Sequence, residues 1–269
     1  MAHEQAAHRV LGGGFAGVYA VMALERALGK KAGVEITLVS RDNFFLFTPM
    51  LHEVAAADLD TTHIVNPIRK LLTFANFFQG EVQSIDLHAR TVHVRHGVED
   101  PHGHDLPFDH IVLALGSTIS FFNTPGAADL CFPMRSRGDA LALRNRVLTS
   151  LEEADSECCT ATRRALLNFA VTGGGFAGVE TIGAIHDYVH GALRFYPNLK
   201  PDDVRMVLVH SGPTLLPELD ARLGRYAEQK LRSRGAEVRL GTKVAAVTTK
   251  GRAKAATAKA ELATARQPA

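Results

Sequence analysis

The sequence predicts an α/β protein with parallel β-sheets and a small antiparallel β-meander. Three observations support this prediction. The heptapeptide GGGFAGV occurs twice, at Gly12–Val18 and at Gly173–Val179. Each copy follows a short apolar run and opens a segment with helical periodicity. Between the copies, apolar and polar residues alternate over 81–94, which is typical of short antiparallel strands.

The first copy lies in a segment expected to form strand, turn, helix and strand. We place these at Arg9–Leu11, Gly12–Gly17, Val18–Leu28 and Val34–Val39. The predicted first strand is short, and Gly29 or Gly33 can end the helix. This order of elements implies parallel pairing with a right-handed crossover.

The middle of the chain contains mixed patterns. Thr62–Phe74 has helical spacing, and Glu81–Val94 reads as the meander. His110–Leu115 is an apolar run typical of a buried strand, and Gly116 follows it. A further helix is expected around Asp139–Glu153.

The second copy repeats the order of the first. Strand, turn, helix and strand are expected at Leu166–Thr172, Gly173–Gly178, Val179–Leu193 and Val204–Val209. Asp220 can cap a helix that runs to Ser233, and Ala236–Leu240 follows as another strand. The two repeats therefore predict two parallel sheets.

Composition excludes several classes of protein. The formal net charge is +2, but the last twenty residues contain five basic residues and one acidic residue, so the basic pI comes from the tail. Nucleic-acid binding by the rest of the chain is therefore not expected. Three cysteines without CxxC spacing do not form a disulfide framework, which fits a reducing compartment. The sequence shows no signal peptide and no apolar run long enough for a membrane span.

The glycines of each copy have separate physical roles in a GxGxxG dinucleotide-binding motif. Gly12 and Gly173 make the tight turn, and the second glycines let a pyrophosphate approach the backbone. The third glycines let helix and strand pack closely, while the helix N-terminus offers N–H groups to the phosphates. Two such motifs in strand–turn–helix context predict two Rossmann-like dinucleotide-binding units.

The acidic residue that commonly holds a ribose hydroxyl is missing from both units. Ser40, Arg41 and Asp42 follow the second strand of the first unit, and His210 and Ser211 follow that of the second. Ser40 can bond a ribose hydroxyl, whereas the Ser40–Arg41 pair by itself suggests a 2′-phosphate. The preference for NADH or NADPH is left open by these residues.

The paired units resemble the two-dinucleotide-binding-domain flavoproteins, and more closely the type II NADH dehydrogenases. The segments RVLGGGFAGVYAVMALER, LVSRDNFFLFTPMLHEVAAADLD and IVLALGS resemble the FAD half of that family. The segments VTGGGFAGVETIGAIHDYV and VLVHSGPTLLPELDARL resemble its NADH half. The resemblance implies an FAD-binding domain over 1–160 and an NAD(P)H-binding domain over 161–249. The composition of 250–269, rich in Ala and Lys without an apolar face, predicts a disordered tail.

The resemblance also implies roles for individual residues. Glu180 matches the acidic residue near the nicotinamide and flavin, and a carboxylate there can handle protons during quinone reduction. The alternative for Glu180 is a first-turn acid favoured by the helix dipole. The residues implied to contact FAD are Gly12, Gly14, Phe15, Ala16, Gly17, Ser40, Arg41, Pro49, Met50, Leu51 and Gly116. Those implied to contact NAD(P)H are Gly173, Gly175, Phe176, Ala177, Gly178 and His210.

The implied activity is oxidation of NADH by FAD followed by reduction of a quinone. The family suggests a cytoplasmic protein, peripheral on the cytoplasmic face of the inner membrane, with a possible homodimer. Family members continue beyond this length with a flavin-binding return segment and membrane-docking helices. The sequence therefore suggests a C-terminally truncated member, produced by a truncated gene or a changed reading frame. Two alternatives are a non-catalytic nucleotide-binding remnant and a soluble NADPH-dependent flavoprotein reductase.

Other kinds of site are not expected. CxxxxC and further placed cysteines are missing, so disulfide-reductase and sulfide-oxidation chemistry are excluded, and Cys131 reads as a small buried hydrophobe. No metal site is predicted, because the histidines of the meander lack companion cysteine or glutamate at zinc spacing. His186 and His190 are spaced i, i+4 without a third ligand. The phenylalanines at positions 44, 45, 47, 121 and 122 lack the interleaved basic residues of a nucleic-acid platform.

Overall fold

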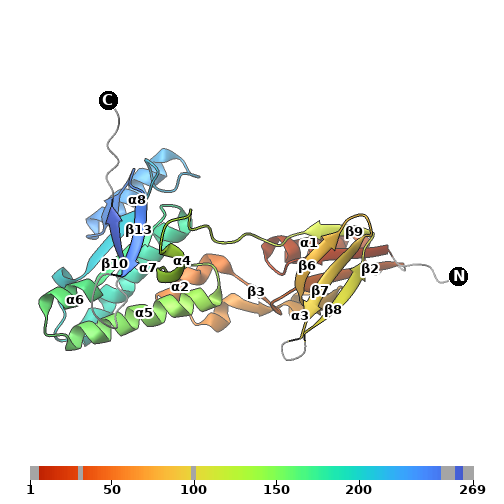
Figure 1. Cartoon of the computed structure of the whole chain (residues 1–269), viewed down its shortest axis with the longest axis horizontal. Coiled ribbons are helices and arrows are strands. Elements are labelled where there is room, and N and C mark those ends of the chain that lie inside the picture. The colour runs from red at the N-terminus through yellow and green to blue at the C-terminus, as the bar shows by residue number, and fades with distance from the viewer. Residues whose placement is uncertain (1–5, 30–32, 98–100, 250–257, 263–269) are drawn as a thin grey trace. The chain divides into compact units, whose positions relative to one another are not determined.

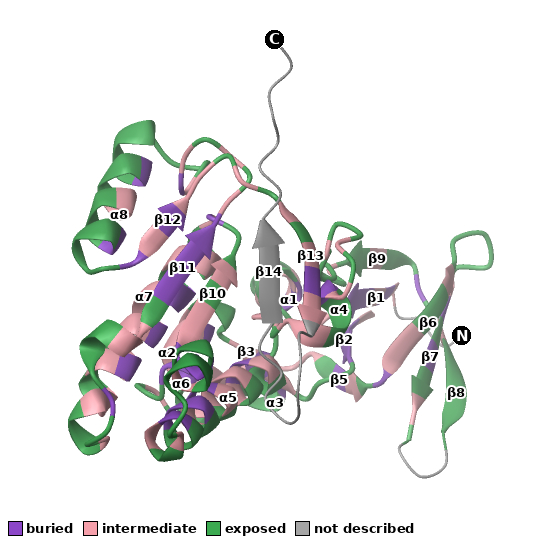
Figure 2. Cartoon of the chain, turned by 60° about the vertical axis from the view of Figure 1, so that its left-hand side comes forward, coloured by how far each residue is buried: buried purple, intermediate pink, exposed green. Residues whose placement is uncertain are grey.

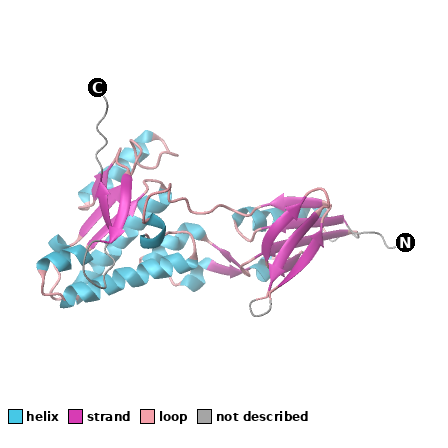
Figure 3. Cartoon of the chain, in the orientation of Figure 1, coloured by secondary structure: helices cyan, strands magenta, loops and turns pink. Residues whose placement is uncertain are grey.

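A computed structural model describes residues 6–29, 33–97, 101–249 and 258–262. The chain divides into two compact units (Figure 1). Unit 1 comprises 1–47 and 62–118, and unit 2 comprises 48–61 and 119–269. Figure 3 shows that both units contain helices and strands. The predicted fold class is confirmed, because each unit contains a parallel sheet with helices and unit 1 also contains an antiparallel meander.

The parallel sheet of unit 1 has the strand order β5-β2-β1-β9. Its strands are β1 (Ala6–Leu11), β2 (Val34–Ser40), β5 (Asn76–Gln79) and β9 (His110–Leu113). Strand β1 begins three residues before the predicted start at Arg9, since β2 pairs with it from Ala6 onward. The prediction of a short first strand was therefore wrong.

Successive residues of β1 and β2 point to opposite faces of this sheet, and each face has its own apolar core. Val10 and Leu38 pack with Val18 and Val21 of helix α1 (Phe15–Leu28) on one face. Leu11 and Val39 pack on the other face against the meander of β6 (Glu81–Asp86), β7 (Thr91–His96) and β8 (His102–Pro107). The sheet is thus covered by helix on one side and by antiparallel strands on the other.

The prediction of a helix over Thr62–Phe74 is wrong. The chain forms a 3-10 turn (Thr61–Ile64), strand β4 (Val65–Pro67) and the short helix α3 (Ile68–Leu71) instead. Strand β4 pairs antiparallel with β3 (Phe44–Leu46). Pro67 lacks the N–H that a continuing helix would need, and it precedes the first residue of α3. The helix therefore begins only after Pro67, although the side chains before it have helical spacing.

The parallel sheet of unit 2 has the order β10-β11-β12, at Asn168–Thr172, Arg205–Val209 and Glu237–Arg239. Strand β11 lies in the centre and is the most buried (Figure 2). The helices of the unit include α5 (Arg137–Ser156), α6 (Thr160–Leu166), α7 (Phe176–Ala192) and α8 (Ala221–Ser233). As predicted, Asp220 caps α8, its carboxylate accepting the N–H of Arg222 at 2.8 Å.

Unit 2 also receives a segment from the first half of the chain. A 3-10 turn (Thr48–Met50) leads into helix α2 (Leu51–Ala55), which packs against α5 and α7. Leu51, Val54 and Ala55 are its buried residues. Residues 119–160 group with unit 2 as well, which differs from the predicted boundary at 160, because α5 and α6 pack in the core of unit 2.

Unit 2 also contains α4 (Ala127–Leu130), β13 (Val244–Thr249), β14 (Ala258–Leu262) and 3-10 turns at Leu193–Phe195 and Pro201–Asp203. The backbone N–H of Val247 in β13 donates to the carbonyl of Pro125 at 2.9 Å. The tail predicted to be disordered over 250–269 falls largely outside the described residues. Its residues 258–262 differ from that prediction, because they pair antiparallel with β13 as β14.

No helix in the described residues has the length and apolar character needed to cross a bilayer.

One buried carboxylate ties helix α1 to the chain that enters β5. Oε1 of Glu25 accepts the backbone N–H groups of Thr73, Phe74 and Ala75, each at 2.8 Å. Burial by itself raises the pKa of Glu25, but these three hydrogen bonds outweigh it and lower the pKa below the ordinary value of 4.5. The ionised carboxylate is therefore part of the folded structure.

We predict that Glu25→Ala lowers the free energy of unfolding by at least about 2 kcal/mol, because three buried donors lose a charged acceptor. Glu25→Gln keeps an oxygen and costs less. Since the folded pKa is depressed, the wild-type contribution is present above pH 4.5 and is lost as the pH falls through the folded pKa. Urea unfolding followed by circular dichroism at several pH values checks this; an unchanged pH profile in Glu25→Gln would contradict it.

Candidate functional site

The two GGGFAGV copies fold into the same turn. Gly12 has a φ of +113° and Gly173 a φ of +109°, values that favour glycine. The N–H of Gly12 donates to the carbonyl of Val39 at 2.8 Å, and that of Gly173 to Val209 at 2.9 Å. Each turn therefore joins the end of one strand to the end of its parallel neighbour.

The third glycine of each copy is required by close packing. A Cβ at Gly17 would overlap the carbonyl oxygen of Gly12, and one at Gly178 would overlap that of Gly173. Each helix thus begins directly against the turn that precedes it. This is the close packing of helix against strand that the third glycine of the motif predicts.

The second glycine of each copy is the N-cap of a long helix and leaves the first backbone N–H groups of that helix without a side-chain partner. Gly14 precedes α1 and Gly175 precedes α7, and neither helix has a side-chain cap or an acidic residue in its first turn. A Cβ at Gly14 would meet nothing within 4 Å. Phe15, Ala16, Phe176 and Ala177 follow as exposed residues. Unsatisfied N–H groups and the helix dipole make such a terminus suitable for phosphate.

Ser40 and His210 occupy equivalent places beneath the two turns. The Ser40 side chain lies against Gly13, and the His210 ring lies against Gly174. Nδ1 of His210 accepts the N–H of Gly174 at 3.1 Å, and its Nε2 is buried with no hydrogen-bond partner in the described part of the chain. Both residues therefore support the middle glycine of the turn.

The other predicted residues of unit 1 lie around its glycine turn or on the surface. Gly116 follows β9 with a φ of +77°, just beyond Ala114, whose carbonyl oxygen packs against Gly12. Arg41 is exposed and pairs with Asp42 at 3.7 Å. Aromatic rings lie beside the turn, with the ring centroid of Phe15 at 4.8 Å from Phe45 and 5.6 Å from Phe47.

Pro49, Met50 and Leu51 belong to unit 2, the unit that contains Glu180. Glu180 is the fifth residue of α7 and lies beyond the first turn, so a helix-dipole role does not explain it. Its Oε2 lies 3.4 Å from Nδ1 of His52, the second residue of α2. The side chain of Glu180 is 42% exposed, whereas that of His52 is 16% exposed.

His52 extends this contact into a short chain of titratable groups. Its Nε2 lies 3.1 Å from Oε1 of Glu53. Further along, burial and the nearby charge of Glu53 raise the pKa of Asp58 above its ordinary value. An exposed carboxylate backed by an imidazole and a second carboxylate can hold and pass a proton. His52 was missed in the sequence because no spacing connects positions 52 and 180.

Glu218 is a second residue that the sequence did not indicate. Its Oε1 lies 3.8 Å from the point where a Cβ of Gly175 would be. A carboxylate therefore stands at the open N-terminus of α7, where the helix dipole favours a negative charge. No carboxylate lies that near Gly14 in the described residues.

The three cysteines, Cys131, Cys158 and Cys159, are all free. Burial raises the pKa of the Cys131 thiol, which fits its predicted structural role. The backbone N–H of Thr162, at the start of α6, lowers the pKa of Cys159. Neither GGGFAGV turn contains a cysteine that could take part in dithiol chemistry.

Comparison with known proteins identifies relatives along most of the chain. The model of the pyridine nucleotide-disulphide oxidoreductase family matches residues 7–266. The external alternative NAD(P)H-ubiquinone oxidoreductase B1 of Solanum tuberosum mitochondria is 33% identical over 80% of this chain and 39% of its own length. The type II NADH:quinone oxidoreductase Ndh of Mycobacterium tuberculosis is 33% identical over 91% of this chain and 52% of its own.

Solved structures share the fold. NDH2 of Plasmodium falciparum in complex with NADH has a TM-score of 0.83 at 21% identity, covering 91% of this chain and 50% of that one. The sulfide:quinone oxidoreductase of Aquifex aeolicus has a TM-score of 0.70 at 19% identity, covering 90% and 52%. The chain thus spans about half the length of the proteins it matches, or less.

We predict that Gly178→Ala and Gly183→Ala, two changes in the same helix, have opposite effects on stability. A Cβ at Gly178 collides with the carbonyl of Gly173, whereas one at Gly183 meets nothing within 4 Å. Gly178→Ala is expected to cost about 2 kcal/mol through backbone displacement. Gly183→Ala is expected to add up to about 1 kcal/mol through helix propensity. Urea unfolding measures both, and equal effects would refute the packing argument.

Proposed function

Because the chain belongs to the pyridine nucleotide-disulphide oxidoreductase family, we propose that it is an FAD-dependent NAD(P)H dehydrogenase that delivers electrons to a quinone. The predicted resemblance to type II NADH dehydrogenases is confirmed by relatives whose names describe NADH:quinone and NAD(P)H-ubiquinone oxidoreduction. The observation that carries the proposal is the pair of open glycine turns with the same backbone geometry.

FAD is assigned to unit 1. The residues present fit its ADP part, since the uncapped N-terminus of α1 and the open space at Gly14 leave room for a pyrophosphate. Phe15 and its neighbouring rings offer an apolar wall beside that space. Ser40 and Gly116 are the other residues beside this turn that we assign to FAD, and the exposed Arg41 would contact FAD from the surface. When bound, FAD supplies the hydride-accepting and electron-transferring chemistry of the proposed reaction.

The nicotinamide nucleotide is assigned to unit 2. Gly173, Gly175 and Gly178 would hold its pyrophosphate at the start of α7, with Phe176 and Ala177 on the first turn. His210 holds the middle glycine in place, and its Nε2 is buried against Gly212. Neither an acidic residue nor an arginine follows β11 directly, so NADH and NADPH are both substrates to test.

Glu180 and His52 are proposed to manage protons during quinone reduction. The exposed carboxylate of Glu180 would face the substrate, and His52 would exchange a proton with it across 3.4 Å. Pro49, Met50 and Leu51 lead into the helix that carries His52, and the family resemblance assigns this segment to the flavin. A quinone needs two protons for full reduction, and this chain of groups is suited to deliver them.

The family relationship also suggests a peripheral protein on the cytoplasmic face of the inner membrane and a homodimer, and both stay predictions. Purified protein gives the first test of the proposal. Flavin absorbance together with NADH oxidation in the presence of a soluble quinone is expected, and NADPH is compared at equal concentration. A colourless protein without NADH oxidation would instead support the alternative of a nucleotide-binding remnant.

We predict that Glu180→Gln lowers the rate of quinone reduction about 100-fold, because proton transfer contributes on this scale. Flavin reduction by NADH under anaerobic conditions is expected to change little, since hydride transfer needs no proton from Glu180. Stopped-flow absorbance separates the two half-reactions. Glu153→Gln, on the exposed surface of α5, is the control. An equal loss in both half-reactions would contradict the assigned role.

We predict that Glu218→Gln strengthens NADH binding severalfold, because the carboxylate near Gly175 repels the pyrophosphate. The gain should shrink as ionic strength rises, since exposed charges are screened. Titration of NADH followed by its fluorescence gives the dissociation constants. Weaker binding by Glu218→Gln would show that the carboxylate bonds the nucleotide instead.

A further inference from the structure

Three histidines gather on one face of the β7–β8 hairpin in unit 1. His96 of β7 lies directly opposite His102 of β8, and His104 lies opposite Val94. Because side chains alternate along a strand, His96, His102 and His104 share the face of Val92 and Val94. Val92 and Val94 belong to the core between the meander and the parallel sheet. The imidazoles therefore lie at the rim of that core.

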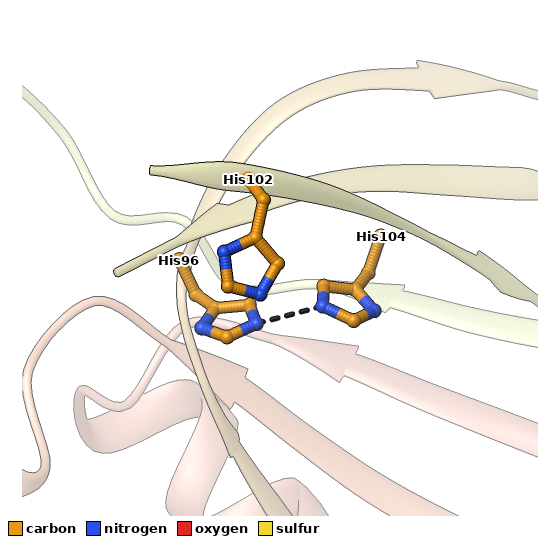
Figure 4. A group of neighbouring side chains, drawn as sticks. All are labelled: His96, His102 and His104. Atoms are coloured by element: carbon orange, nitrogen blue, oxygen red, sulfur yellow. Dashed lines mark hydrogen bonds between the residues drawn. The ribbon is translucent and has the colours of Figure 1, made fainter. Parts of the chain in front are cut away.

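The nitrogen atoms of these rings converge (Figure 4). One ligating nitrogen can be chosen from each ring so that all lie within 4.8 Å of one another. The Nε2 atoms of His96 and His104 are 2.7 Å apart, and the ring centroids of His96 and His102 are 4.0 Å apart. Two imidazole nitrogens bound to a tetrahedral ion at 2.0–2.1 Å are ~3.3 Å apart. Small side-chain rotations would bring all three to that spacing.

An aromatic ring from the parallel sheet packs against two of the histidines. The ring of Phe78 in β5 contacts His96 and His104 edge to face, at centroid distances of 5.6 and 5.5 Å.

We propose that His96, His102 and His104 form a binding site for a divalent late transition-metal ion of the Zn²⁺ class. Three imidazoles suit Zn²⁺, Cu²⁺ and Ni²⁺ better than Mg²⁺ or Ca²⁺, which prefer oxygen ligands. A fourth position is left to water or to an incoming ligand. The bound ion links β7 to β8 and so braces the hairpin that covers the parallel sheet. The sequence predicted no metal site here, because cross-strand register cannot be read from the spacing of histidines.

Isothermal titration of the untagged full chain with Zn²⁺ tests the site. One ion per chain is expected, and His104→Gln and His102→Gln should each weaken binding at least about 10-fold. His93→Gln is the matched control, because His93 lies on the opposite face of the same hairpin and pairs with Asp105 at 2.8 Å. His190→Gln controls for another close pair, His186 and His190, whose ring centroids are 4.0 Å apart.

Co²⁺ provides a second readout that depends on geometry. Its visible absorption is expected to be intense in the wild-type chain and in the two control variants, as for a tetrahedral site, and to be lost in His104→Gln. Circular dichroism establishes that each variant is folded. Retention of binding in His102→Gln and His104→Gln, or its loss in His190→Gln, would overturn the proposal.

Discussion

Both units depend on one contact, a carbonyl oxygen of the turn packed against the Cα of a glycine in the following helix. Gly17 lies against Gly12 in this way, and Gly178 against Gly173. The contact fixes where the helix begins relative to the end of the strand. It thereby points the free N–H groups of the helix into the space above the turn, where a phosphate can be bound. The same seven residues produce this arrangement twice, although the strands that flank them differ.

Residues 48–61 lie between two segments of unit 1 in the sequence but belong to unit 2, where they include helix α2. This excursion brings His52 within 3.4 Å of Glu180, which is distant in the sequence. A site made in this way depends on the packing of α2 against α5 and α7 as much as on either side chain. The proposed proton chain and the segment assigned to the flavin ring are thus held by the same short helix.

Much of this architecture was predictable from local pattern. Apolar runs, glycine turns and the cap at Asp220 specify their elements through interactions within a few residues. The failures have other causes. Strand β4 forms because β3 pairs with it and because Pro67 cannot continue a helix, although its residues are spaced like a helix. His52 and Glu218 meet their partners only through the fold, and the three histidines of the hairpin converge only through its cross-strand register.

The two sheets differ in how their first strands are flanked. Strand β1 has a neighbour on each side, whereas in the described residues β10 pairs with β11 alone. Strand β10 is therefore at the edge of the described sheet, whereas β1 is in the interior of its own sheet. The turn at Gly173 follows a strand with one described neighbour, and the turn at Gly12 follows a strand with two. The same heptapeptide thus adopts one geometry on two differently supported strands.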